Sequence, residues 1–255
     1  MAHIHHAAAE GFAAGAANYV AGRPEYPAEI EQWLSHELAL GPGKCVLDLG
    51  AGTGKFTPRL LSTGAKVLAV EPVPEMLGQL IRQYPEVETH SGSAEQIPLD
   101  AATVDAVVCA QSFHWFATPA ALHEIRRVLK PGGALGLIWN VRDDSIPWVA
   151  ELTRIMKPFE GDTPRFHSQK WRLSFPAPGF GPLREHRFQN THTGPPEQVI
   201  VERILSVSFI SALPPREQNQ VAAQLRQVID QSPELAGKAQ VTFPYETLAF
   251  VGNKL

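Results

Sequence analysis

Cysteine and long apolar runs are both scarce in this sequence. It has 2 cysteines among 255 residues, so we predict neither a disulfide framework nor a metal site. No apolar run approaches the roughly 18 residues that span a membrane, and residues 1–10 (MAHIHHAAAE) lack the apolar region of a secretion signal. Cys45 and Cys109 fall in apolar segments, which is typical of core thiols in a reducing compartment. We therefore expect a cytoplasmic protein with no membrane partner.

A surplus of positive charge is absent as well. Lysine and arginine number 22 against 26 aspartates and glutamates, a formal net charge of −4. Such a chain has no general attraction for nucleic acid, so a small-molecule partner is favoured. His3, His5 and His6 have no acids or cysteines beside them, which is more typical of a terminal tail than of a metal site. The oligomeric state is left open.

The sequence does contain a glycine-rich turn after a short apolar segment. Residues 46–57 (VLDLGAGTGKFT) place Gly50, Gly52 and Gly54 directly after a predicted buried strand. This spacing differs from that of a phosphate-binding P-loop and from the G-x-G-x-x-G of dinucleotide-binding proteins. Because few side chains intervene, a ligand can lie against the backbone, facing a helix expected to begin near Gly54. Asp48 is the acid best placed to receive a cationic or hydroxyl group of that ligand.

A second acid follows at the end of the next predicted strand. Residues 66–70 (KVLAV) form another apolar run that stops at Glu71. It lies about 20 residues past the first glycine, where an acid conventionally binds ribose hydroxyls. The two features together predict a nucleotide-type site.

These motifs resemble those of a known enzyme family. The run from Asp48 to Gly54 (DLGAGTG), with Glu71, resembles the cofactor signature of class I S-adenosylmethionine-dependent methyltransferases. Residues 93–99 (SAEQIPL), 105–109 (DAVVC) and 128–133 (VLKPGG) resemble later segments of that family in the expected order. The resemblance implies S-adenosylmethionine as cofactor and a Rossmann-like α/β fold. Its sheet would have seven strands, the sixth and seventh forming an antiparallel end, with helices on both faces.

The rest of the chain is consistent with one methyltransferase domain over residues 1–255. Residues 1–30 would form an N-terminal arm or lid, 31–140 the cofactor-binding core, and 141–255 a substrate-covering insert with the C-terminal strands. Residues 183–193 and 241–251 alternate as strands, whereas 195–213 and 215–231 have helical spacing. Residues 141–182 are rich in aromatics and proline, and we expect irregular helices there.

The resemblance also assigns cofactor contacts. They are Asp48, Gly50, Ala51, Gly52, Gly54, Glu71, Pro72, Met76, Ser93, Ala94, Glu95 and Gln111. Ser93 stands where the family often has an aspartate for the adenine amino group, which leaves Glu95 or the Ala94 backbone as substitutes. Met76 would rest on the adenine, although core packing accounts for it equally well.

The segment before the first strand carries a further resemblance. Residues 19–27 (YVAGRPEYP) resemble the N-terminal lid of a small-molecule subgroup of type 11 methyltransferases that includes trans-aconitate methyltransferase-like enzymes. By that resemblance Tyr19 and Arg23 approach the methionine end of the cofactor, where an arginine can pair with the carboxylate. The alternative is that Arg23 and Tyr26 only hold the arm to the body.

Residues 111–116 (QSFHWF) follow the fourth predicted strand, at the point where ligands bind in such sheets. They lack the N/D-P-P-Y/F motif of base methyltransferases, so methylation of a nucleic-acid base is not expected. His114 is the candidate catalytic residue, as base or donor, with a purely structural role as the alternative. His114, Trp115 and Trp139 are the candidate substrate contacts. Arg142, Arg165, His167 and Trp171 are further candidates by location only.

The sequence thus favours transfer of a methyl group from S-adenosylmethionine to a small molecule, at a carboxylate or hydroxyl oxygen. Two alternatives stay open: a non-catalytic S-adenosylmethionine-binding protein, and a nicotinamide-dependent oxidoreductase on a related sheet.

Overall fold

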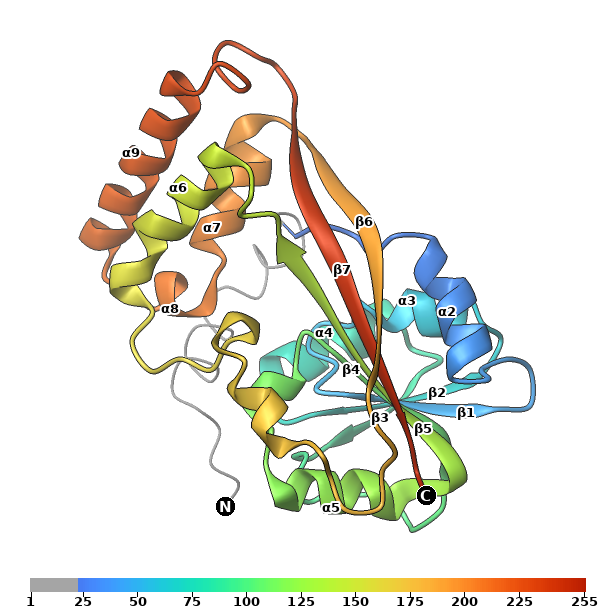
Figure 1. Ribbon diagram of the computed structural model, residues 1–255. Helices are drawn as coiled ribbons and strands as arrows, with labels where there is room; N and C mark the ends of the chain where they lie inside the picture. The colour runs from blue at the N-terminus through green and yellow to red at the C-terminus, as the bar shows by residue number, and fades with distance from the viewer. Residues whose placement is uncertain (1–22) are drawn as a thin grey trace.

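The computed structural model describes residues 23–255, so Tyr19 and the N-terminal histidines lie outside the described residues. Its centre is a seven-stranded sheet in the order β3-β2-β1-β4-β5-β7-β6 (Figure 1). The strands are β1 (Cys45–Leu49), β2 (Lys66–Glu71), β3 (Glu88–Ser91), β4 (Val104–Ala110), β5 (Leu129–Arg142), β6 (Arg184–Gly194) and β7 (Val241–Asn253). The first five are parallel, and β7 runs antiparallel to β5 and β6. The predicted fold, with its antiparallel end, is confirmed.

Alternate residues of the parallel strands face two separate cores, as the pleat of a strand requires. Leu47 and Leu49 pack on the side of α5 (Pro119–Val128). Val46 packs on the other side with residues of three helices: α2 (Glu29–Glu37), α3 (Thr57–Leu61) and α4 (Pro74–Gln83). Helices therefore cover both faces of the sheet, and the strands are apolar on both sides.

A third core lies beyond the end of the sheet. The long strands β5 and β7 continue together as far as the pair Arg142 and Tyr245, and a group of helices packs on this extension (Figure 1). This helical group consists of α6 (Pro147–Met156), the π-helical turn η5 (Glu197–Glu202), α7 (Arg203–Leu205), α8 (Ser208–Ser211) and α9 (Pro215–Gln231). Its core joins Leu152, Ile204 and Leu225 to Phe243 of β7.

Three local predictions are corrected. The helix expected near Gly54 begins at Thr57, because Gly52 and Gly54 have φ of +59° and +84°, which an α-helix cannot contain. The helical pattern over 195–213 is broken into η5, α7 and α8, with an extended residue at Val207 (ψ 131°). Residues 141–182 include one regular helix, α6, before the short 3₁₀ turns η2 (Lys157–Phe159), η3 (Phe166–Ser168) and η4 (Lys170–Ser174).

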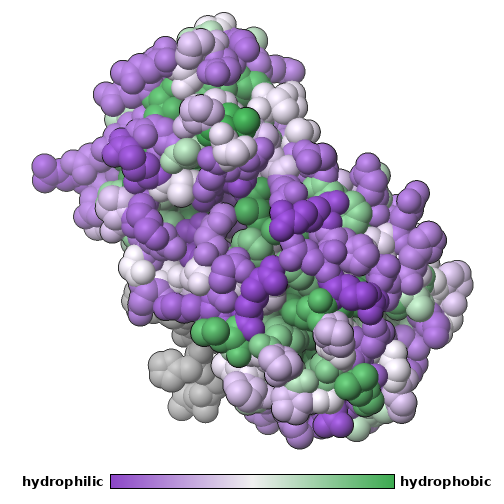
Figure 2. All heavy atoms as spheres, viewed as in Figure 1, coloured by the Kyte–Doolittle hydropathy of each residue, from purple (hydrophilic) through white to green (hydrophobic). Residues whose placement is uncertain are grey.

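Hydrophilic residues predominate on the face shown in Figure 2, and hydrophobic residues gather there in separate patches. Within residues 23–255 no helix is both long enough and apolar enough to cross a membrane. The same residues contain no group of three or more histidine, cysteine, aspartate or glutamate side chains arranged to hold a metal ion.

Candidate active site

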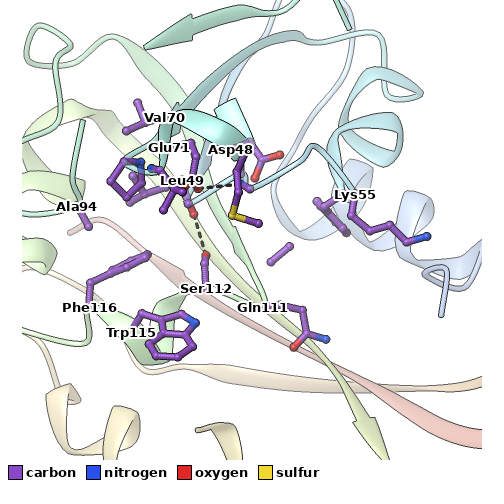
Figure 3. A pocket seen from close by; sticks show the side chains of 18 of the residues that line it. Asp48, Leu49, Lys55, Val70, Glu71, Ala94, Gln111, Ser112, Trp115 and Phe116 are labelled. Atoms are coloured by element: carbon purple, nitrogen blue, oxygen red, sulfur yellow. Dashed lines mark hydrogen bonds between the residues drawn. The ribbon is translucent and has the colours of Figure 1, made fainter. Parts of the chain in front are cut away.

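A cavity lies at the carboxyl ends of β1, β2 and β4, the edge at which doubly wound sheets bind ligands. Figure 3 shows Asp48 and Glu71 on one side of it, and Gln111 and Trp115 on the opposite side. The predicted cofactor contacts that border this first cavity are Arg23, Asp48, Gly50, Ala51, Gly52, Glu71, Pro72, Met76, Ser93, Ala94, Glu95 and Gln111. Residues from five separate segments of the sequence are thus brought together.

The three glycines of the turn have different roles. A Cβ at Gly50 would lie 2.8 Å from the Cβ of Ser112, and one at Gly54 would lie 2.9 Å from the Tyr84 ring. Gly54 packs behind the turn and does not border the cavity. Gly52 has φ +59°, and a Cβ there would meet only the flexible end of Met76, at 3.2 Å. Gly52 therefore keeps the cavity floor free of a side chain.

Glu71 ties the turn to the end of β2. Glu71 is 4% exposed, and its carboxylate accepts hydrogen bonds from the backbone N–H groups of Gly52 (2.8 Å) and Val73 (2.9 Å). Burial raises the pKa of Glu71, and the two hydrogen bonds oppose that shift. Each oxygen keeps a lone pair for a ligand hydroxyl, which is the arrangement expected of a ribose-binding acid.

Asp48 is the second acid of this cavity. Its side chain is buried, and the Thr57 hydroxyl donates to Oδ2 at 3.0 Å. Burial raises the pKa of Asp48 to about 7, although the Thr57 hydrogen bond opposes it. A buried carboxyl of this kind is stabilised in its charged form by a cationic ligand. S-adenosylmethionine carries an ammonium and a sulfonium, so the side-chain-free floor and the two acids fit this cofactor.

The end of β4 is held against the end of β1. The Ser112 hydroxyl donates to the Leu49 carbonyl at 2.8 Å, as the dashed line in Figure 3 shows. Gln111 adopts φ +58°, and its side-chain amide donates to the Asn140 carbonyl at 3.2 Å. Gln111 thereby lies between the first cavity and a second one beside it.

The second cavity lies between the sheet edge and the helical group. It shares Arg23, Gln111, Trp115, Asn140 and Arg203 with the first cavity. Its other lining residues include the candidates His114, Trp139, Arg142, Arg165 and His167. Trp171 borders neither cavity: it is 1% exposed and packs on Trp139 at a ring distance of 4.6 Å.

The hydrogen bonding of His114 defines its chemical form. Nδ1 accepts from the indole Nε1 of Trp139 at 3.0 Å. Burial, together with the nearby charges of Arg165 and Arg23, lowers the pKa of His114 to about 3. The ring is therefore neutral near pH 7 and carries its proton on Nε2, because Nδ1 is the acceptor. This geometry favours the predicted donor role over that of a general base.

The segment preceding α2 is attached to the sheet at several points. The Glu25 carbonyl accepts from Asn140 at 3.3 Å and from Asn190 at 2.8 Å. Tyr26 is buried, with its ring edge-on to Phe56 at 4.7 Å. Arg23 borders both cavities and donates to the Ser206 carbonyl at 3.2 Å. Tyr26 therefore anchors the segment, and both Tyr26 and Arg23 border the first cavity.

Several lining residues escaped sequence analysis. Lys55 follows the glycine turn and pairs with Glu25, Asn140 follows the buried part of β5 and is itself partly exposed, and Arg203 comes from α7. Lys55 could have been predicted from the sequence, since it belongs to the glycine-rich motif. No sequence pattern marked Arg203 as a site residue, because it lies in a helical pattern far along the chain. It reaches the site through the folding of the helical group.

The fold and the site together define a class I S-adenosylmethionine-dependent methyltransferase. An antiparallel β7 lies between β5 and β6, unlike the 3-2-1-4-5-6 order of dinucleotide-binding folds. Residues 47–137 match the family of the methyltransferase domain. An uncharacterized methyltransferase-like protein of Schizosaccharomyces pombe is 42% identical over 244 residues, which cover 95% of each chain. The chain belongs to this methyltransferase family.

Solved structures agree on the fold. A putative methyltransferase from an antibiotic biosynthesis pathway of Anabaena variabilis matches with a TM-score of 0.63 at 18% identity, covering 91% of this chain and 98% of that one. Geranyl diphosphate methyltransferase in complex with S-adenosylmethionine matches with a TM-score of 0.52 at 15% identity, covering 89% and 85%. Because the chain belongs to the methyltransferase family, S-adenosylmethionine is its cofactor, and the oxidoreductase alternative is set aside.

Proposed function

We propose that the protein is an active enzyme that methylates an oxygen of a small molecule, and that this oxygen belongs to a carboxylate. The observation that carries the proposal is the second cavity, which adjoins the cofactor cavity and is bordered by Arg23, Arg142, Arg165 and Arg203. Arginine binds carboxylates through two parallel hydrogen bonds. A cavity of this composition favours an anionic acceptor over a phenol or an amine.

Bound S-adenosylmethionine supplies an electrophilic methyl group on its sulfonium. The residues of the chain have to hold and orient the two reactants and exclude water. A carboxylate is already deprotonated near pH 7 and needs no base. This agrees with a neutral His114 that donates through Nε2, whereas a hydroxyl acceptor would need a stronger base than an imidazole of pKa about 3.

The test is a methyl-transfer assay with radiolabelled S-adenosylmethionine and two panels of acceptors, small carboxylic acids and small phenols. We expect a base-labile methyl ester from members of the first panel and no product from the second. Methyl ethers from phenols alone would overturn the choice of carboxylate. Tight cofactor binding with no product from either panel would support the non-catalytic alternative, in which the protein serves as a ligand sensor.

A further inference from the structure

Trp139 is the most buried of the residues that border the second cavity, with 0% of its surface exposed. Its indole packs on the rings of Trp171, Phe166 and Phe250, at centre distances of 4.6, 5.1 and 5.8 Å. A side chain enclosed in this way is held in one position by its neighbours and offers almost no surface to an acceptor. Trp139 can therefore act on the reaction mainly through the residue that its indole nitrogen contacts.

The residue that the indole nitrogen contacts is His114, whose Nδ1 lies 3.0 Å from Nε1 of Trp139. An indole N–H can only donate, so Nδ1 has to accept, and the proton of a neutral ring has to be on Nε2. Turning the ring over would place a C–H group against the indole N–H and leave a buried donor without a partner, which is costly. The indole of Trp139 therefore selects one tautomer and one orientation of the His114 ring.

A second tryptophan of the same aromatic cluster separates this hydrogen bond from packing. Trp171 is 1% exposed, and its Nε1 is buried without a hydrogen-bond partner in the described part of the chain. The cluster thus accommodates an indole whose N–H is not used. Trp171 contributes packing alone, whereas Trp139 contributes packing and a donor directed at His114.

The tautomer of His114 matters because the ring is neutral. Burial, together with the nearby charges of Arg165, Arg23 and His167, lowers the pKa of His114 to about 3. A neutral imidazole donates through one nitrogen only. Since Nδ1 is taken up by Trp139, Nε2 is the nitrogen left for a ligand in the second cavity, which His114 borders.

We propose that Trp139 is a positioning residue for methyl transfer, whose indole N–H holds His114 in the tautomer that donates from Nε2 to the acceptor carboxylate. This inference rests on the proposed function and adds a residue to it. The hydrogen bond from Nε2 orients the acceptor towards the methyl group, and no proton has to be transferred. Trp139 then acts through His114 and not as the direct substrate contact that the sequence suggested.

The first test is nitrogen-detected NMR of protein labelled with ¹⁵N-histidine, in which the signals of His114 are those missing from His114→Gln. The wild type should show one neutral tautomer, with the proton on Nε2. Trp139→Phe keeps an aromatic ring but loses the donor, so we expect a second tautomer with the proton on Nδ1. Trp171→Phe is the matched control: it makes the same substitution in the same cluster without removing a hydrogen bond, and it should keep the single tautomer.

The second test is a double-mutant cycle on turnover, measured with an acceptor that the wild type methylates. Trp139→Phe should lower kcat about fivefold, the effect of one lost hydrogen bond, whereas Trp171→Phe should stay close to the wild type. In the His114→Ala background, Trp139→Phe should have no further effect, because Trp139 acts through His114. A loss of equal size in both backgrounds would indicate a purely structural role and overturn the inference.

The spectrum of the wild type decides the matter even if Trp139→Phe fails to fold, since a proton on Nδ1 would overturn the inference. A single Nε2–H tautomer in folded Trp139→Phe would overturn it as well. If the wild type shows the expected tautomer but transfers no methyl group to any acceptor, the proposed function fails instead.

Discussion

Asp48 shows at the scale of one residue how a ligand site costs stability. Burial holds its pKa at about 7, against 3.8 for an ordinary aspartate. The folded state therefore keeps a proton that the unfolded state has lost, and the free energy of unfolding falls as pH rises between these two values. Three pKa units correspond to about 4 kcal/mol. The protein without cofactor should be less stable at pH 8 than at pH 5.

Asp48→Asn should remove this part of the pH dependence, because the asparagine oxygen still accepts from Thr57 and carries no charge. We expect the variant to be more stable than the wild type at pH 8, by up to about 4 kcal/mol, and similar to it at pH 4. Urea unfolding at the two pH values measures the difference. A variant less stable than the wild type at pH 8 would contradict this description of Asp48.

His114 gives a second prediction at this scale. With a pKa of about 3, its ring should stay neutral from pH 8 to pH 5, while exposed histidines titrate near 6.5. Nitrogen-detected NMR of the ring should show a proton on Nε2 and no shift change over this range. Turnover should fall about tenfold in His114→Ala, because the variant loses one hydrogen bond to the substrate. It should fall less in His114→Gln, because the glutamine amide also donates a hydrogen bond. If turnover, measured as a function of pH, changed with the protonation of His114, this result would contradict the donor role.

At the scale of elements, the segment before α2 is hydrogen-bonded to the antiparallel end of the sheet, and we expect this contact to affect cofactor binding. Asn190 of β6 donates to the Glu25 carbonyl at 2.8 Å. Glu25 lies two residues along the chain from Arg23, which borders both cavities. Losing this hydrogen bond costs about 1 kcal/mol. Asn190→Ala should therefore weaken cofactor binding about fivefold, because the segment covers the cavity less of the time.

Thr193→Ala provides the control, since Thr193 lies on the same strand and its hydroxyl forms a hydrogen bond with the Thr242 hydroxyl at 2.9 Å. It should leave the dissociation constant of S-adenosylhomocysteine unchanged. If the two variants weaken binding equally, the effect belongs to β6 as a whole and not to the segment before α2.

Elements whose signals are local were predictable. The apolar runs that end at Leu49 and Glu71 predicted β1 and β2, and the glycines between them predicted the turn, because these patterns depend on neighbours in sequence. The break at Val207 was not predictable, since residues 195–213 keep an amphipathic pattern throughout. Its cause is packing: η5 and α7 cover β7, while α8 turns away to border the second cavity.

For the whole molecule, the sequence predicted many of the residues that border the first cavity and fewer of those that border the second. The first cavity is built from consecutive motif positions such as Asp48 to Gly52. The second depends on contacts between segments far apart in sequence, for instance Arg142 and Arg203, which no local pattern connects. The methyltransferase core was therefore recognisable from one stretch of sequence, whereas the composition of the second cavity became visible only in the fold.

The central claim is that the turn at Gly52 binds the cofactor, and calorimetric titration with S-adenosylmethionine and S-adenosylhomocysteine tests it most directly. The wild type should bind both, and Gly52→Val neither, because the added side chain enters the cavity beside Met76. Gly43→Val imposes similar backbone strain at φ +82° with no atom within 4 Å of the new Cβ, and it should bind like the wild type. Unchanged affinity in a folded Gly52→Val, or no binding by the folded wild type, would contradict the claim.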